Sequence, residues 1–227
     1  MDWENWHDAY DRPDSALAAR LIAVKSLIRQ ALDDAPPGPL RVVSLCAGQG
    51  RDLIEALADH PRRADVRALL VELDPRNTAR AEADAAAAGL GGQVEVLTGD
   101  AALTDHYQGL VPADLVIACG IFGNVTDVDI ERSINTFDQF CRTGATVVWT
   151  RHRGGATDRA ALICDWFEQR GYERVWVSDP AVHQGIGAHR FTGTPRPLLT
   201  GRSMFTFVGY DVLKQGCSLE GRPGHPG

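Results

Sequence analysis

Apolar residues recur along the chain in two alternating patterns. From Asp14 to Asp33 they are spaced as on one face of a helix, so we expect an amphipathic helix with Asp14 or Ser15 as its N-cap, ended by the segment APPGP. After residue 39, short apolar runs alternate with longer segments of helical spacing. The runs span 40–46, 66–73, 94–99, 113–120 and 144–150, and the helical segments span 51–59, 76–88, 127–141 and 157–170.

This alternation predicts an α/β domain. Unbroken β-branched runs separated by helices are typical of a parallel sheet that is covered on both faces and wound in right-handed crossovers, which gives a doubly wound fold. Two further strands are expected at 172–177 and 204–212. They are joined by a connection at 178–203 that is rich in Gly, Pro and His. A connection of this length is more often functional than idle, with disorder as the alternative.

The chain divides into three expected regions. Residues 1–39 form an N-terminal lid and amphipathic helix, residues 40–212 form the sheet domain, and residues 213–227 form a disordered tail. Trp6, His7 and Tyr10 stand in an acidic N-terminal segment. They either fold over a bound ligand or pack on the edge of the sheet.

Charge and cysteine content narrow the function classes. The net charge of -7 provides no general basic field, so a nucleic-acid partner is disfavoured. No apolar stretch reaches the roughly 18 residues that span a bilayer, and the acidic N-terminus is unlike a signal peptide, so we expect a cytoplasmic protein without a membrane partner. The oligomeric state is left open. The cysteines are far apart, which predicts reduced thiols and no metal site: Cys46, Cys119, Cys141, Cys164 and Cys217.

The first apolar run leads into the stretch SLCAGQGRD at 44–52. Gly48 and Gly50 permit a tight turn with close approach of a ligand to the backbone, and the following helix directs its N-terminal amides at a negative group. A dinucleotide fingerprint G-x-G-x-x-G needs a third glycine, but Leu53 stands in that place. A nicotinamide-dependent oxidoreductase is therefore the weakest of the functions considered.

The turn resembles the first motif of the class I S-adenosylmethionine-dependent methyltransferases, which ends in G-x-G. In VVSLCAGQG, Gly48 and Gly50 match that motif, whereas Ser44 stands where the family often has an acid and Cys46 where it has its first glycine.

Three later loops extend the resemblance. LLVELDP presents Glu72 for the two ribose hydroxyls, and TGDAALTD presents Asp100 and Ala101 for the adenine. ACGIFGNV resembles the loop beneath the sulfonium.

The resemblance implies a Rossmann-like methyltransferase fold with a mainly parallel seven-stranded sheet and S-adenosyl-L-methionine as the cofactor. The alternative is that the acids at 72, 74 and 100 merely cap helices. The implied cofactor-binding residues are Cys46, Ala47, Gly48, Gly50, Arg51, Asp52, Glu72, Leu73, Asp74, Gly99, Asp100, Ala101, Cys119 and Gly120.

The residues around the acceptor are inferred from their expected places at strand ends. His152 is the candidate general base and Arg151 the candidate substrate anchor, the alternative being a solvated basic loop. GIFGNV differs from the N-P-P-Y type of sequence that resembles adenine-amino methyltransferases, which argues for a small-molecule acceptor. The candidate substrate-binding residues are Trp6, His7, Tyr10, Phe122, Asn124, His183 and His189.

The leading hypothesis is thus an S-adenosylmethionine-dependent methyltransferase that acts on a small molecule by direct in-line transfer. A base is needed only if the acceptor atom carries a proton at neutral pH. A non-methylating S-adenosylmethionine-binding protein on the same fold is the second hypothesis, and an NAD(P)-dependent oxidoreductase is the third. The acceptor and the methylated atom are left open.

Overall fold

The computed structural model of the protein describes residues 15–153 and 158–208. Seven strands form one sheet in the order β3-β2-β1-β4-β5-β7-β6. The strands are β1 (Leu40–Leu45), β2 (Val66–Glu72), β3 (Val94–Thr98), β4 (Ala113–Ala118), β5 (Cys141–His152), β6 (Tyr172–Val177) and β7 (Gln184–Phe191). The first five pair in parallel, while β7 is antiparallel to both β5 and β6. The predicted doubly wound, mainly parallel sheet is confirmed.

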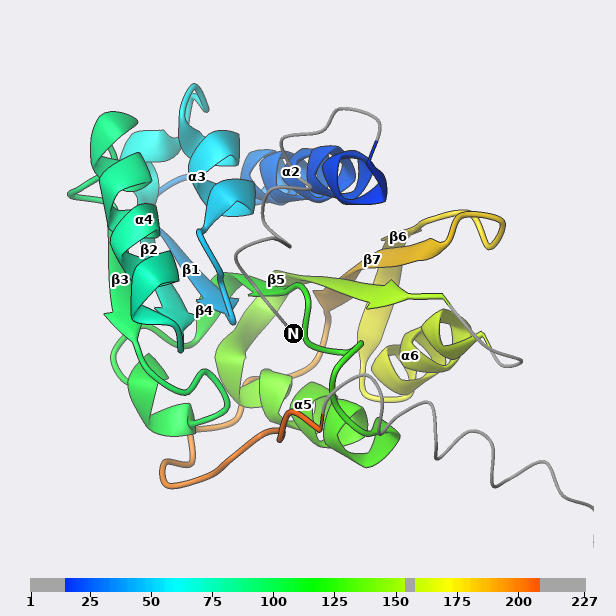
Figure 1. Cartoon of the computed structure of the whole chain (residues 1–227). Coiled ribbons are helices and arrows are strands. Elements are labelled where there is room, and N and C mark those ends of the chain that lie inside the picture. Colours follow the sequence, from blue (N-terminus) through cyan, green and yellow to red (C-terminus); the bar gives the residue numbers. More distant parts are fainter. Residues whose placement is uncertain (1–14, 154–157, 209–227) are drawn as a thin grey trace, which may run out of the picture.

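Helices cover both faces of the sheet (Figure 1). They are α2 (Ala16–Asp34), α3 (Arg51–Leu57), α4 (Pro75–Ala87), α5 (Asp127–Phe140) and α6 (Arg159–Glu168), with short 3-10 turns η2 (Arg63–Asp65) and η3 (Thr104–Tyr107). The helices α2, α3 and α4 contribute Ile28, Leu53 and Ala81 to one core. On the other face, α5 and α6 contribute Phe137 and Phe167 to a second core. This layering positions the loops at the ends of the central strands.

The predicted N-terminal helix is confirmed as α2. Ser15 is its N-cap, with a side-chain oxygen that accepts a hydrogen bond from the Ala18 amide at 3.0 Å. One face of α2 packs on the sheet and on α3. None of the helices within 15–153 and 158–208 has both the length and the apolar character needed to cross a membrane.

The seventh strand is not where the sequence places it. The structure has β7 at Gln184–Phe191, inside the expected connection, and the described part of the expected strand, 204–208, forms no strand. The sequence pattern did not predict β7, because Gly185 and Gly187 interrupt its apolar run. Gly187 pairs with Trp149 on β5, and a Cβ there would lie 2.7 Å from the Trp149 indole nitrogen. The glycine is thus a packing requirement of this strand.

After β7 the chain returns across the α5 side of the molecule as an extended segment, 198–208, which we call the C-terminal strap (orange in Figure 1). The Thr104 amide donates to Arg202 O at 3.0 Å, and the Met204 amide donates to Ala102 O at 2.9 Å. The Val208 amide then donates to the carbonyl of residue 124, at 3.0 Å. The strap therefore ends beside the loop that follows β4.

Candidate functional site

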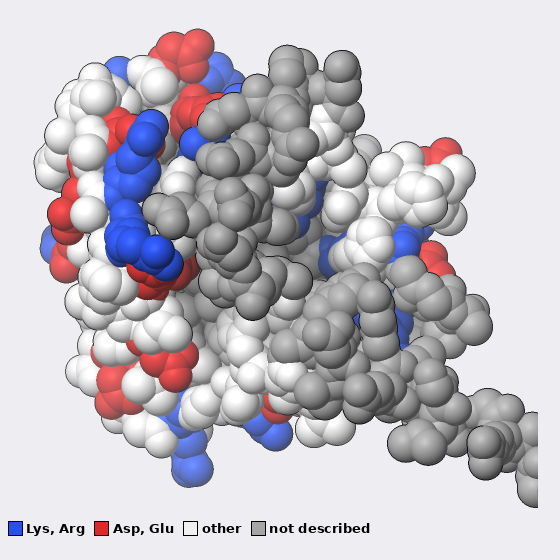
Figure 2. Space-filling view, in the orientation of Figure 1, with Lys and Arg blue, Asp and Glu red and all other residues white. Residues whose placement is uncertain are grey.

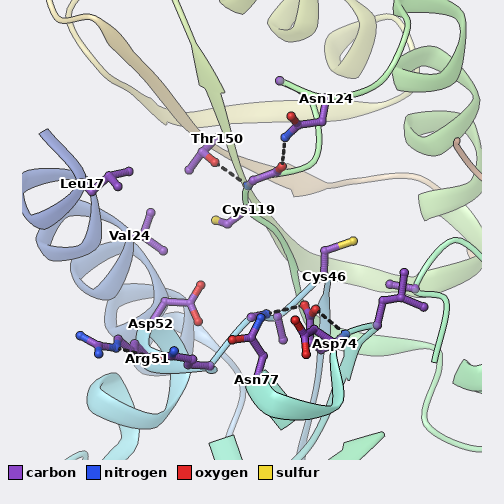
Figure 3. Close-up of a pocket in the computed structure, with 18 of the residues that line it drawn as sticks. Leu17, Val24, Cys46, Arg51, Asp52, Asp74, Asn77, Cys119, Asn124 and Thr150 are labelled. Atoms are coloured by element: carbon purple, nitrogen blue, oxygen red, sulfur yellow. Dashed lines mark hydrogen bonds between the residues drawn. The ribbon is translucent and has the colours of Figure 1, made fainter. Parts of the chain in front are cut away.

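A cavity of about 1010 Å³ lies at the carboxyl ends of β1, β2 and β4, where the strand order reverses. Ligands of doubly wound sheets bind at this position. The walls of the cavity come from the turn after β1, the loops after β2, β3 and β4, the end of β5, and the N-terminal half of α2. Figure 3 shows these side chains directed at a common space.

The turn after β1 owes its shape to three left-handed residues at alternate positions: Cys46 (φ 50°), Gly48 (φ 56°) and Gly50 (φ 66°). A Cβ at Gly50 would overlap the Leu70 side chain, so glycine is required there on two grounds. Cys46 is the one non-glycine residue with positive φ in the described chain, a strain of roughly 1 kcal/mol. The cysteine therefore adopts the conformation that the family's glycine would take.

Glu72 joins two of the loops that form the cavity. One carboxylate oxygen accepts a hydrogen bond from the Gly48 amide at 2.8 Å, and the other accepts from the Asp74 amide at 2.9 Å. Each oxygen keeps a second lone pair for a ligand hydroxyl. The carboxylate is thus held in place by backbone before any ligand arrives.

The acids at the strand ends are only in part helix caps. Asp74 is the N-cap of α4, where its side chain accepts from the Arg76 amide at 2.9 Å. Asp100 instead stabilises its own turn by accepting from the Ala102 amide at 2.9 Å, and Glu72 ends β2. The capping alternative therefore accounts for Asp74 alone.

Burial raises the pKa of three ionisable side chains in the cavity lining. Burial raises the pKa of Asp52, against the opposing effects of the Leu53 amide and the charge of Arg20. Burial likewise raises the pKa of the Cys119 thiol, with Asp52 acting in the same direction. Burial, together with Glu72, raises the pKa of Cys46 as well. Both thiols thus stay protonated at neutral pH, so neither is an activated nucleophile.

The loop after β4 is tied to the end of β5. The Gly120 amide donates to the Thr150 hydroxyl oxygen at 2.9 Å, and the Asn124 side-chain amide donates to Gly120 O at 2.8 Å. His152 follows at the rim of the cavity, where partial burial and the neighbouring His183 and Arg151 lower its pKa. Its imidazole is neutral at pH 7 and can accept a proton.

The part of the chain that places these loops also matches a known family. Residues 16–153 match the model of a protein family described as "Putative methyltransferase". The chain belongs to this methyltransferase family. The match confirms the resemblance read from the four loops and removes the support for a nicotinamide-dependent enzyme. No curated protein sequence matches the chain significantly.

Solved structures of methyltransferases share the fold of this methyltransferase-family chain. An O-methyltransferase family protein from Burkholderia thailandensis is 16% identical with a TM-score of 0.63, over 84% of this chain but only 59% of that one. Magnesium protoporphyrin IX methyltransferase from Synechocystis PCC 6803, with bound SAM, is 14% identical with a TM-score of 0.60, over 85% and 92% of the two chains. A SAM-dependent methyltransferase from Thiobacillus denitrificans, in complex with S-adenosyl-L-homocysteine, is 22% identical with a TM-score of 0.51, over 69% and 66%.

Most of the predicted cofactor residues line the cavity of this methyltransferase fold. The exceptions are Gly50 and Gly99, which support the turns behind its wall. Of the predicted substrate and catalytic residues, His152 and Asn124 also line it. The residues that line the cavity and that the sequence did not single out are Leu17, Arg20, Leu21, Val24, Gln49, Pro75, Arg76, Asn77, Gly123, Thr150, Gln184 and Phe207.

The structure places His189 and Phe122 in the core, where both side chains are fully buried and do not line the cavity. His189 Nδ1 accepts from the Trp149 indole at 3.0 Å, and its ring stacks on Phe167 with centroids 4.7 Å apart. Phe122 lies 6.3 Å from Trp149. The register of β7 directs residue 189 to the α6 side, away from the cavity.

Five further predicted residues do not contribute to the described cavity wall. The Arg151 guanidinium donates to the carbonyl of residue 122, and neither Arg151 nor the exposed His183 lines the cavity. Trp6, His7 and Tyr10 lie outside the described residues. Among the residues that the structure does describe, no group of three or more His, Cys, Asp or Glu side chains is placed to hold a metal ion.

Proposed function

We propose that the chain binds S-adenosyl-L-methionine in this cavity and transfers its methyl group to a small-molecule acceptor by direct in-line displacement. The observation that carries the proposal is the Glu72 carboxylate, which two backbone amides orient at the end of β2 in a methyltransferase-family chain. A ribose offers two adjacent hydroxyls, and a carboxylate with a lone pair on each oxygen can accept both.

The other loops fit the remaining parts of this cofactor. The left-handed turn at 46–50 leaves bare backbone for the methionine portion, with Asp52 enclosed beside it. Asp100 keeps one oxygen for the adenine amino group, because its other oxygen accepts from Ala102. Cys119 and Gly120 also line the cavity, and they are the residues proposed to lie beside the sulfonium.

The protein's contribution to methyl transfer is alignment and exclusion of water, since a thioether leaves without an acid. The bound cofactor supplies the methyl group. His152, neutral because its pKa is lowered, is the residue that can accept a proton from a hydroxyl or amine acceptor. The geometry favours a different role for Arg151, which holds the loop after β4 through the carbonyl of residue 122.

Surface charge supports a small acceptor over a nucleic acid. Figure 2 shows one narrow blue strip over α4 with red side chains beside it, and no basic patch that extends across the rest of the described face. Arg76 pairs with Asp74 at 2.7 Å and Arg80 with Asp84 at 2.8 Å. The similarly folded Synechocystis protein, a magnesium protoporphyrin IX methyltransferase, is named for a small-molecule acceptor.

Calorimetric titration with S-adenosyl-L-homocysteine tests the cofactor site. Glu72→Ala should weaken binding by about 1–3 kcal/mol, the value of hydrogen bonds to a charged group, and Glu72→Gln should weaken it less because its amide oxygen still accepts one. Glu82→Ala is the matched control, since Glu82 is an exposed acid on α4 outside the cavity. Equal affinities in the wild-type protein and Glu72→Ala would refute the assignment.

A labelled-methyl assay separates transfer from binding alone. Methyl transfer from labelled S-adenosylmethionine into a metabolite extract is the expected result. Binding of S-adenosylhomocysteine without any transfer would instead favour the non-methylating alternative on the same fold.

A further inference from the structure

The cavity has a part that the proposed cofactor contacts leave unused. Its volume of about 1010 Å³ is at the upper end of the roughly 300–1,000 Å³ of small-molecule sites, which leaves space for a second molecule. In Figure 3, α2 faces the ends of β4 and β5 across this space, well away from Asp74 and Asn77. We define the acceptor chamber by six residues of the cavity lining: Leu17, Leu21 and Val24 of α2, Asn124 and Thr150 after β4 and on β5, and Phe207, whose strap is hydrogen-bonded to Asn124 O.

Phe207 is the aromatic wall of the acceptor chamber. It is 43% exposed, while Phe205 behind it is buried and meets it edge-on, with centroids 5.8 Å apart. Hydrogen bonds of the residues before and after Phe207 fix the backbone of the C-terminal strap at this position. The amide of Thr206 donates to an α5 carboxylate at 3.2 Å, and the amide of Val208 donates to Asn124 O at 3.0 Å. A fixed, half-exposed ring in a cavity wall presents apolar surface that a ligand ring can cover.

The acceptor chamber is also electrically neutral. Its six side chains are apolar, amide or hydroxyl groups. Arg20 lies beside it, but its charge acts on Asp52, a carboxyl whose pKa burial raises, so this cation already faces an acidic group. The rim imidazole of His152 is neutral at pH 7, since burial lowers its pKa. An anion or a cation would therefore lose its hydration there without gaining a charged partner.

One polar group in the chamber is suited to a hydroxyl. The Asn124 side-chain nitrogen already donates to Gly120 O at 2.8 Å, so the amide oxygen is the atom that can accept a hydrogen bond from a ligand hydroxyl. Because the same residue's backbone carbonyl anchors the strap at Val208, Asn124 and Phe207 are held in a fixed relation to each other.

From this geometry we infer that the acceptor chamber binds an uncharged aromatic molecule that bears a hydroxyl group, with its ring against Phe207 and its hydroxyl at Asn124. The inference rests on the proposed function, for which it names the substrate class. It assigns Phe207 as a residue that determines acceptor specificity.

Titration of the full chain, saturated with S-adenosylhomocysteine, tests the inference. The probes are 2-naphthol and 4-phenylphenol as uncharged phenols, and 2-naphthoate as the matched anion. The phenols should bind, and 2-naphthoate should bind more weakly. Phe207→Leu should weaken phenol binding about two- to tenfold, the value of an aromatic pair beyond its buried area, and leave the affinity for S-adenosylhomocysteine unchanged. Leu199→Ala, an exposed position on the same strap, is the control that should change neither affinity.

Three outcomes would overturn the inference: no phenol binds, 2-naphthoate binds more tightly than 2-naphthol, or Phe207→Leu binds the phenols as well as the wild-type protein. If S-adenosylhomocysteine does not bind the protein, the proposed function fails, and this result is distinct from the three outcomes above. In that case, binding of 2-naphthol to the protein alone, weakened by Phe207→Leu, would still support an aromatic site.

Discussion

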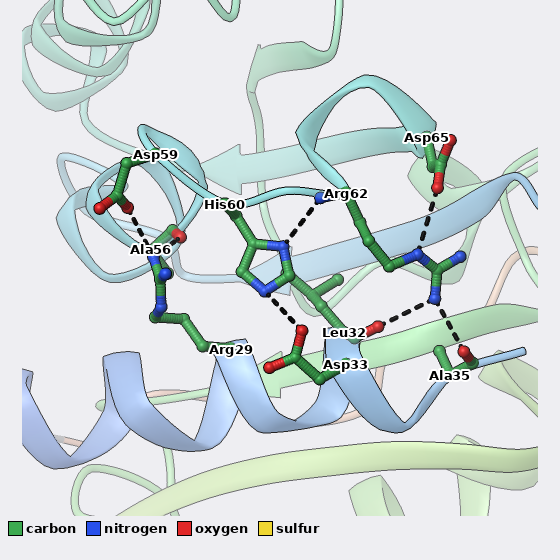
Figure 4. Close-up of polar contacts among 9 residues, drawn as sticks. All are labelled: Arg29, Leu32, Asp33, Ala35, Ala56, Asp59, His60, Arg62 and Asp65. Carbon is green, nitrogen blue, oxygen red and sulfur yellow. Dashed lines mark hydrogen bonds and ion pairs between the residues drawn. The ribbon is translucent and has the colours of Figure 1, made fainter. Parts of the chain in front are cut away.

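The side chain of Arg62 forms hydrogen bonds with the C-terminal end of α2 and with the residues that follow it (Figure 4). One terminal nitrogen donates to Leu32 O at 2.9 Å and Ala35 O at 2.7 Å. The other donates to Pro36 O and Gly38 O, both at 2.9 Å. The last carbonyls of a helix have no partner within it, so Arg62 satisfies groups that would otherwise depend on water.

The cost of Arg62→Ala follows from these four bonds. Each net hydrogen bond contributes about 0.5–1.5 kcal/mol, and the freed carbonyls of Ala35, Pro36 and Gly38 can be rehydrated because these residues are partly or fully exposed. We therefore expect a loss of about 2–4 kcal/mol in the free energy of unfolding. A domain of typical stability, about 5–15 kcal/mol, would still fold.

Two further variants isolate the guanidinium. Arg62→Lys should recover less than half of the loss, since one ammonium cannot reach four carbonyls in different directions. Asp65→Ala removes the ion pair with the Arg62 Nε at 3.1 Å, and an exposed pair of this kind contributes at most about 1 kcal/mol.

Urea denaturation followed by circular dichroism, at constant m-value, measures these differences. Affinity for S-adenosylhomocysteine should change little in folded Arg62→Ala, because α2 contributes Leu17 and Val24 to the acceptor chamber rather than to the cofactor half of the cavity. If Arg62→Ala lowers the free energy of unfolding by less than about 0.5 kcal/mol, or if Asp65→Ala lowers it equally, the stabilising role of the Arg62 hydrogen bonds at the end of α2 is refuted.

Three more outcomes follow from the structure. Cys46→Gly should raise the free energy of unfolding by up to about 1 kcal/mol in chemical denaturation, since glycine accepts φ 50° without strain; a decrease would contradict the strain. Gly187→Ala should lower it by about 1–3 kcal/mol by overlap with Trp149, whereas the control Gly91→Ala, with open space around its Cβ, should change it little. Burial lowers the pKa of His189 from 6.5 to about 4, so the unfolded chain binds the additional proton and stability should fall as pH drops from about 6.5 towards 4. Denaturation at pH 7.5 and 5 should show about 2 kcal/mol of this loss, and an equal loss in His189→Gln would exclude the histidine as its source.

Most of the sheet could be predicted because its parallel strands are buried on both faces. Such strands read as unbroken apolar runs, and the helices between them keep their own spacing. β7 is the exception, since it packs small residues against Trp149. The requirement for Gly187 arises from a ring 38 positions earlier in the chain, and no local pattern contains that information.

The residues of the site also differ in whether they could be predicted from the sequence. Glu72 and Asp100 follow strands whose order in the sheet can be inferred, so their convergence at one edge was predictable. Gln184 lies at the cavity because the antiparallel register pairs it with His152. Phe207 lies there because the strap crosses the α5 side of the molecule. Neither position could be inferred without the tertiary structure.

The two halves of the cavity therefore depend on different kinds of contact. The cofactor half is built from turns that immediately follow strands, and Glu72 links two of them by backbone hydrogen bonds. The acceptor chamber is built from α2 and the C-terminal strap, whose positions depend on distant anchors such as Arg62 and Asn124. Side chains such as Leu17 and Phe207 can change in that chamber without altering the turns that hold the cofactor. Substitution there should change which acceptor binds, while S-adenosylhomocysteine affinity stays constant.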